Sequence, residues 1–157
     1  MTMKLRSLTP LLMAVAITPS LTISTEPSQA QNSPAPDQRG FWCDTSTGMP
    51  MTMYQNAAGS VEHWIEWSSG AFSQSGYDPL TRCQNVTERL ETQRRAGRLK
   101  YITSTMQEGL PVVCTATTQG ECDVMLFTLR RQEEVVPVMS QLLALREGVK
   151  GVPPLQL

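Results

Sequence analysis

The chain has 157 residues and a formal net charge of −1 at pH 7, with 40% hydrophobic and 17% charged residues. These values are typical of one ordinary globular domain with a single modest core. A nearly neutral charge balance excludes broad electrostatic attraction to nucleic acid, so we expect no nucleic-acid partner.

The first thirty residues have the pattern of a secretory signal peptide. Lys4 and Arg6 precede the apolar run of residues 11–17, and small residues follow at Ser28 and Ala30. The alternative is an uncleaved membrane anchor, but the run is shorter than the roughly 20 apolar residues that span a bilayer. We therefore expect residues 1–30 to be removed, and the mature chain to have no transmembrane helix.

The following segments divide the mature chain into a leader, a domain and a tail. Residues 31–39 contain two prolines and no large apolar side chain, which predicts a flexible leader. The domain should occupy residues 40–148, and residues 149–157 should form an irregular tail.

Three strands are expected in the first half of the domain. Short runs with alternating apolar and polar residues begin at Phe41, Met51 and Val61. Turn residues separate them at 47–50 and 56–60.

A charged helix should come next. Asp78 is a good N-cap, Pro79 suits the first helical turn, and Gly97 predicts the end of the helix. Residues at helical spacing that should face the core are Cys83, Val86 and Leu90.

The second half of the chain repeats this order of elements. Strand-like runs begin at Leu99, Pro111 and Asp123, with a turn at residues 108–109. A last helix over residues 137–147 should present Met139, Leu142 and Leu143 on one face. The order predicts an α+β domain, with about six strands in one mainly antiparallel sheet and two helices packed on it.

Four cysteines in an exported chain predict two disulfides. Cys114 and Cys122 should lie opposite each other on consecutive strands, where Cβ atoms are close enough to bridge. This leaves Cys43 to pair with Cys83. The alternative, a zinc site, lacks C-x-x-C spacing, and the lone His63 is far from the later pair, so we expect no metal and no cofactor.

Residues that carry chemistry are scarce. His63 is the single histidine, and its strand neighbours Val61 and Ile65 favour a packed position, so we predict no catalytic residue. Trp64, on the opposite face of that strand, should be exposed. The alternative function is a small hydrolase or carbohydrate-binding module that uses the region of Trp64 and His63.

Basic residues gather towards the end of the first predicted helix, where cations complement the helix dipole. They are either a solvated helix face or a docking surface for an acidic partner or anionic lipid. The candidate partner-binding residues are Trp64, Arg89, Arg94, Arg95 and Arg98.

Several short motifs occur together in a familiar order. They are F-x-C at residues 41–43, HWIEW ending at residue 67, RC at 82–83, YIT at 101–103, PVVC at 111–114 and C-x-x-x-L-F-T-L at 122–129. In this order, over about residues 41–147, they resemble the cyanobacterial circadian-oscillating-protein family. The resemblance implies an exported domain, peripheral membrane association in the founding type, an abundance that follows the daily cycle there, and no catalytic residue.

These observations predict an exported, non-enzymatic domain that binds an unknown protein or membrane surface. Its compartment should be the periplasm, the thylakoid lumen or the cell surface, because disulfides form in such oxidising environments.

Overall fold

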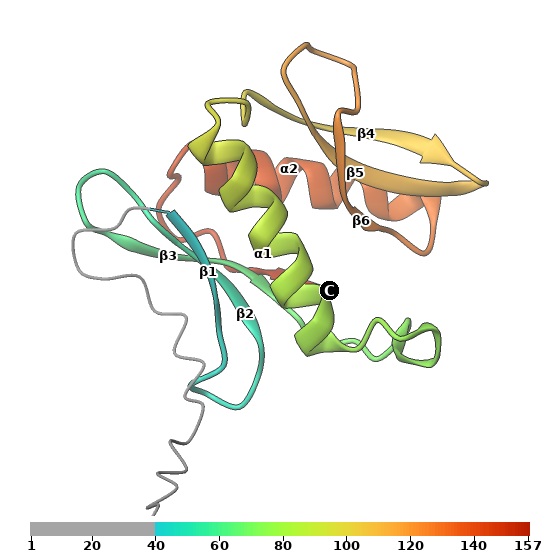
Figure 1. The fold of residues 1–157 in the computed structure, drawn as a ribbon, viewed down its shortest axis with the longest axis horizontal. Helices are drawn as coiled ribbons and strands as arrows, with labels where there is room; N and C mark the ends of the chain where they lie inside the picture. The colour runs from blue at the N-terminus through green and yellow to red at the C-terminus, as the bar shows by residue number, and fades with distance from the viewer. Residues whose placement is uncertain (1–39) are drawn as a thin grey trace, which may run out of the picture. The chain divides into compact units, whose positions relative to one another are not determined.

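The computed structural model describes residues 40–157, so the predicted signal peptide and leader, residues 1–30 and 31–39, lie outside the described residues. The expected α+β class is confirmed (Figure 1). In chain order the main elements are β1 (Gly40–Asp44), β2 (Met51–Gln55), β3 (Val61–Glu66), α1 (Pro79–Arg95), β4 (Tyr101–Gln107), β5 (Leu110–Ala116), β6 (Val124–Thr128), α2 (Val135–Arg146) and β7 (Leu155–Gln156).

The strands form two sheets instead of the single sheet predicted. One sheet has the order β1-β2-β3-β7 and the other has the order β4-β5-β6. All pairings are antiparallel except that of β7 with β3. The tail expected to be irregular therefore ends in a strand, because Leu155 pairs with Ile65 and is buried in the core.

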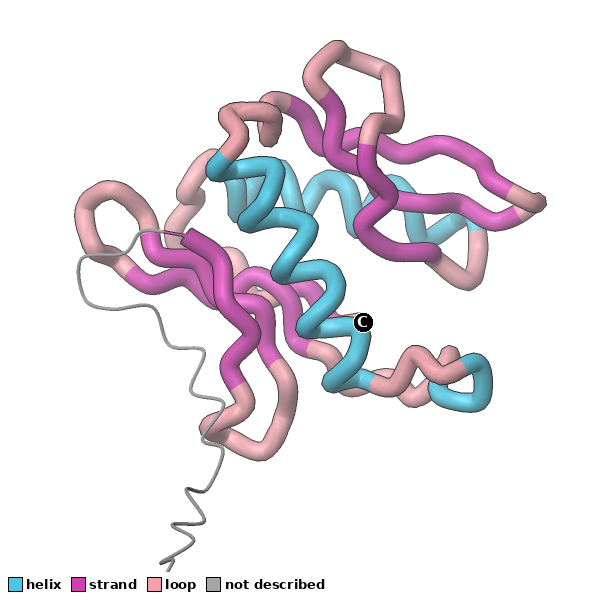
Figure 2. Tube along the Cα trace, viewed as in Figure 1, coloured by secondary structure: helices cyan, strands magenta, loops and turns pink. Residues whose placement is uncertain are grey.

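Both helices contact both sheets (Figures 1 and 2). Helix α1 packs against β1, β2 and β6, while α2 packs against β3, β7 and β4. The sheets also touch directly, since the rings of Trp67 and Phe127 meet edge to face with centroids 6.0 Å apart. One hydrophobic core therefore contains side chains from both sheets and both helices of the described chain.

Helix α1 matches its prediction closely. The Asp78 side chain accepts a hydrogen bond from the Thr81 amide, which caps the helix. The predicted inward residues Cys83, Val86 and Leu90 are all buried.

Helix α2 begins two residues earlier than predicted and turns a different face inward. Its buried residues are Val138, Leu142 and Leu145, which follow helical spacing. Leu143, predicted to lie on the apolar face, is 39% exposed. Neither described helix has both the length and the apolar character needed to cross a bilayer.

The two predicted disulfides are confirmed. Cys43 bonds to Cys83 with their Cα atoms 5.7 Å apart, and Cys114 bonds to Cys122 at 5.2 Å. The predicted register of the second bridge is wrong, because Cys114 lies opposite Met125 and Cys122 lies in the loop before β6. The bridge thus ties a loop back onto its own sheet.

A β-bulge in β3 reverses the expected exposure of two residues. His63 pairs with Met53 and Ile65 pairs with Thr52, so Trp64 is the extra residue between them. The bulge lets Trp64 and Ile65 both face the core. Trp64, predicted to be exposed, is only 3% exposed, and His63, predicted to be packed, is exposed.

Candidate functional site

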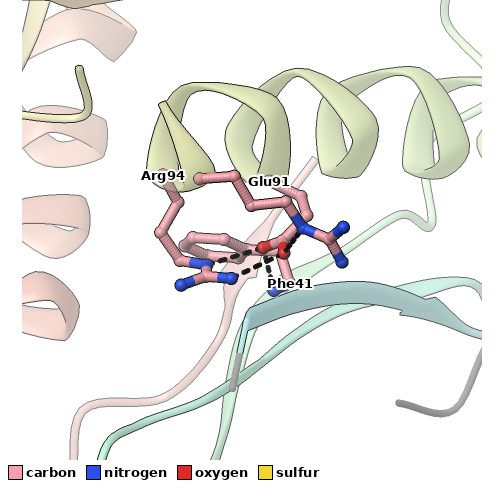
Figure 3. A network of polar contacts seen from close by, with 4 residues as sticks. Phe41, Glu91 and Arg94 are labelled. Carbon is pink, nitrogen blue, oxygen red and sulfur yellow. Dashed lines mark hydrogen bonds and ion pairs between the residues drawn. The ribbon is translucent and has the colours of Figure 1, made fainter. Parts of the chain in front are cut away.

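Two of the predicted partner-binding arginines are engaged inside the domain. The carboxylate of Glu91 accepts hydrogen bonds from Arg94 at 2.7 Å and from Arg95 at 2.6 Å. It also accepts one from the backbone amide of Phe41 at 2.9 Å. Figure 3 shows this carboxylate between Arg94 and the start of β1, so the network fastens α1 to the edge of the first sheet.

The electrostatics of this network favour the ionised carboxylate. Burial opposes the charge on Glu91, but the hydrogen bonds from Arg94, Arg95 and the Phe41 amide outweigh it and lower the pKa of Glu91 to about 2. The hydrogen bond with Glu91 in turn raises the pKa of Arg94. Glu91 therefore offsets one of the two positive charges and holds both guanidinium groups in place.

Arg89 has a different role, at the edge of the second sheet. One of its guanidinium nitrogens donates to the carbonyl oxygens of Met125 at 2.9 Å and Leu126 at 3.1 Å. These carbonyls belong to β6, whose free edge faces α1. Arg98 lies exposed beyond the end of the helix, so the four predicted partner-binding arginines have different surroundings, and their role in binding stays a prediction.

Trp64 is part of an aromatic cluster beneath the surface. Its ring lies 4.8 Å from that of Phe41 and 5.6 Å from that of Tyr54, measured between centroids. Its indole N–H donates to Glu62 at 3.3 Å. Trp64 is therefore buried, although it lines a small cavity of about 240 Å³ together with Arg94.

A groove lies between α1, the segment before it and the edge of the second sheet. Its volume is about 480 Å³, which is within the range of ligand-binding clefts. Three large side chains along it are well exposed, namely Tyr77 at 52%, Leu110 at 41% and Met125 at 37%. Arg82 and Arg89, two turns apart on α1, line the same groove.

Arg82 is the residue that sequence reasoning missed. It is only 8% exposed, and its guanidinium carbon lies 4.8 Å from the ring centroid of Trp67 and 5.5 Å from that of Phe72. It donates to the carbonyl of Ser69 at 2.9 Å. Burial, followed by the nearby charge of Arg130, lowers the pKa of Arg82.

The two groove arginines form no ion pair with a carboxylate in the described part of the chain. Within residues 40–157, the ion pairs involve Arg94, Arg95, Arg130 and Arg131 but neither Arg82 nor Arg89. The spacing of seven residues between the two arginines on one helix was the signal available in the sequence, because it places both on one face. The groove therefore combines apolar surface with two arginines that form no ion pair, and one carboxylate, Glu108, also lies on its lining.

A second cavity of about 480 Å³ brings together Ser60, Glu62 and His63, the types of side chain that the hydrolase alternative requires. The Glu62 carboxylate, however, accepts from Asn56 at 3.1 Å and from Trp64. Among the described residues, no hydrogen bond joins His63 to either Ser60 or Glu62. To activate the Ser60 hydroxyl as a nucleophile, a base such as His63 would have to hydrogen-bond to it, and a third group would have to orient that base. These hydrogen bonds are not made among the described residues.

Metal-binding groups do not gather in the described part of the chain. No cluster of three histidine, cysteine, aspartate or glutamate side chains could hold an ion there. All four cysteines are in disulfides.

Comparisons with known proteins find no match among curated proteins and none among solved structures. The model of one family, described as circadian oscillating protein COP23, matches residues 40–157. The match covers every described element, including β7, and confirms the family resemblance read from the sequence. The chain belongs to the circadian oscillating protein COP23 family.

Proposed function

We propose that this chain is an exported, non-enzymatic binding domain whose α1–β6 groove receives an acidic segment of a partner protein. The observation that carries the proposal is the pair Arg82 and Arg89, which have no carboxylate partner within residues 40–157 and lie beside exposed apolar side chains. A ligand with carboxylates and apolar side chains would satisfy both features.

Export is supported by the predicted signal peptide and by the two disulfides, since such bridges persist in oxidising compartments. The choice among periplasm, thylakoid lumen and cell surface stays a prediction.

The chemistry of the groove limits the kind of protein segment that would bind there. A guanidinium group recognises a carboxylate through parallel N–H donors, which gives direction as well as charge. Glu108 lies on the groove lining near Leu110 and would repel a uniformly acidic segment. The segment should therefore place its acidic residues over α1 and its apolar residues over Leu110 and Met125.

We favour a protein segment over an anionic membrane as the ligand, because two of the arginines on α1 already contact a carboxylate of the same helix. Arg94 and Arg95 share the single carboxylate of Glu91, which offsets one positive charge of the predicted lipid-docking patch. Each basic residue near a lipid surface contributes only about 1 kcal/mol, so the rest of the patch would bind weakly.

The test measures fluorescence anisotropy of a labelled peptide with alternating glutamate and leucine or phenylalanine, against a control peptide with glutamine for glutamate. We expect the acidic peptide to bind more tightly, and Arg89→Gln to raise its Kd roughly tenfold, the effect of losing about 1.4 kcal/mol. Arg89→Lys should keep part of the affinity, while Arg98→Gln, outside the groove, should leave it unchanged.

Two outcomes would overturn the proposal. One is equal binding of the two peptides. The other is co-sedimentation of the chain with phosphatidylserine-containing vesicles that depends on Arg98 and not on Arg89, which would assign a membrane surface instead.

A hydrolase remains the second candidate, because the cavity at His63 also holds Ser60 and Glu62. Turnover of fluorogenic esters by the wild-type chain decides between the two. We expect a rate equal to that of His63→Ala, and ester cleavage abolished by this substitution would instead make the chain an enzyme.

A further inference from the structure

The edges of the two sheets are protected by charged side chains of α1 at two places. Glu91 accepts from the Phe41 amide on edge strand β1, and Arg89 donates to the Met125 and Leu126 carbonyls on edge strand β6. Since unpaired strand edges are templates for pairing with another chain, such contacts block it.

Strand β4 is also an edge strand, and it has no such protection. All residues from Ser104 to Gln107 are exposed, and β4 contains neither proline nor a charged residue. Its register with β5 continues through seven residue pairs without a bulge. Within residues 40–157, no side chain or loop hydrogen-bonds the outer backbone groups of Ile102, Ser104 or Met106; Arg146 of α2 donates only to the carbonyl of Lys100, just before the strand.

We propose that β4 pairs with β4 of a second copy of this chain, antiparallel and about a two-fold axis at Ser104. The pairing joins the two β4-β5-β6 sheets into one continuous sheet and removes both open edges. A two-fold axis makes each contact occur twice, so the surface must be complementary to itself.

The sequence of β4 meets this requirement in one register. With Ser104 at the axis, Thr103 lies opposite Thr105 of the other copy, and Ile102 lies opposite Met106. Pairs of hydroxyl residues and pairs of apolar residues both stabilise adjacent strands. Met106, which is 52% exposed, gains an apolar neighbour.

Charge is complementary in the same register. With Ser104 at the axis, the exposed Lys100, just before β4 of one copy, comes to the same end of the strand pair as the exposed turn residue Glu108, just after β4 of the other. Moving the axis to Thr105 places Glu108 opposite Ile102, and moving it to Thr103 places Met106 opposite Lys100. Both shifts lose the apolar pair, and each sets a charged side chain against an apolar one.

Within one chain, Lys100 and Glu108 are far apart. The seven residues of β4 lie between them and span about 23 Å, so they cannot pair in the monomer. If each single charge reversal, at Lys100 or at Glu108, weakens association and the double reversal restores it, the two positions must be in contact between two copies.

The test is analytical ultracentrifugation of the oxidised chain over a concentration series. We expect a monomer–dimer equilibrium whose Kd rises roughly tenfold in Glu108→Lys and in Lys100→Glu, because each change sets like charges opposite at two symmetric places. The double variant should recover the wild-type Kd. A wild-type chain that stays monomeric, or a double variant no tighter than the single ones, overturns the proposal.

Cross-linking supplies an independent readout. Ser104 lies opposite itself across the axis, so Ser104→Cys should form a disulfide-linked dimer under mild oxidation. The matched control is Ser75→Cys, which is also exposed but lies away from β4. Mass spectrometry confirms the native bridges in both variants, and equal cross-linking rates would contradict the inference.

Discussion

The two sheets are attached to α1 in different ways. The sheet β1-β2-β3-β7 is tied to the helix by the Cys43–Cys83 disulfide and by a hydrogen bond between the buried hydroxyls of Thr52 and Thr87. Glu91 adds a charged hydrogen bond to β1. All of these ties join residues that are distant in the sequence.

The sheet β4-β5-β6 depends more on local closure and apolar packing. Its disulfide spans only eight residues, from Cys114 to Cys122. Arg89 supplies hydrogen bonds from α1, and the buried hydroxyl of Thr115 has no partner among the described residues. The comparison indicates that a disulfide and buried polar contacts hold α1 to the first sheet, whereas Arg89 and apolar packing, with no covalent bond, hold it to the second.

The two disulfides should show the largest difference. Replacing Cys43 and Cys83 together by alanine should lower the free energy of unfolding by about 4 kcal/mol, against about 2.5 kcal/mol for the pair Cys114 and Cys122, because the longer loop gains more unfolded-state entropy. Guanidinium denaturation of both double variants measures this order. Since such domains are stable by only about 5 to 15 kcal/mol, the first variant should approach unfolding. A larger loss from the short bridge would contradict the comparison.

Acid should weaken the tie between α1 and β1. The pKa of Glu91 is lowered from 4.5 to about 2 on folding, so its ionised form stabilises the fold above about pH 4.5 and this stabilisation is lost as the pH falls towards 2. The effect is roughly 3 kcal/mol at neutral pH.

The measurement compares wild type with Glu91→Gln by denaturation at several pH values. The difference between their unfolding free energies should be largest near neutral pH and shrink on acidification, which separates Glu91 from the other carboxylates. A difference that stays constant between pH 6 and 2.5 would assign the role of Glu91 to shape and not to charge.

The buried hydroxyl of Thr52 should contribute next. It accepts from the Trp67 indole at 3.0 Å and shares a hydrogen bond with Thr87 at 3.0 Å. Thr52→Val keeps the shape and leaves both partners buried without a hydrogen bond, so the free energy of unfolding should fall by about 1 to 3 kcal/mol. Urea denaturation measures the loss, and an unchanged midpoint would show that other groups satisfy both partners.

Thr115 provides the matched substitution in the second sheet. Its side chain is as buried as that of Thr52, but its hydroxyl has no partner within residues 40–157. Thr115→Val should therefore be neutral or stabilise the fold by up to about 1 kcal/mol, because it removes an unpaired polar group. A destabilisation equal to that of Thr52→Val would remove the distinction between the sheets.

The arginines predicted to bind a partner also differ in what they contact. The arginine cluster read from the sequence consists of residues with separate tasks, since Arg94 and Arg95 serve Glu91 and Arg89 serves β6. Glu91 lies on the same helix as Arg94 and Arg95, at the three- and four-residue spacings that favour ion pairs, so these contacts follow from the sequence. The β6 carbonyls that Arg89 contacts come from another element, and helical spacing alone does not reveal them.

Local signals predicted much of the fold. The cap at Asp78, the inward stripe of α1, the turn at residues 108–109 and both disulfide pairings agree with the structure. Each depends on residues close in sequence, or on four cysteines with few ways to pair. The groove was not predicted, because its walls come from α1, the preceding segment and the second sheet.

The sequence by itself determined both helices and the first six strands, because capping and periodicity act over a few residues. It also predicted which cysteines bond, although the hairpin register behind the second pair was wrong. Only the tertiary structure decided that the strands divide into two sheets, that a bulge buries Trp64 and exposes His63, and that Arg82 lies beside a groove. These outcomes depend on packing between distant segments, where one inserted residue turns the following side chains to the other face of a sheet.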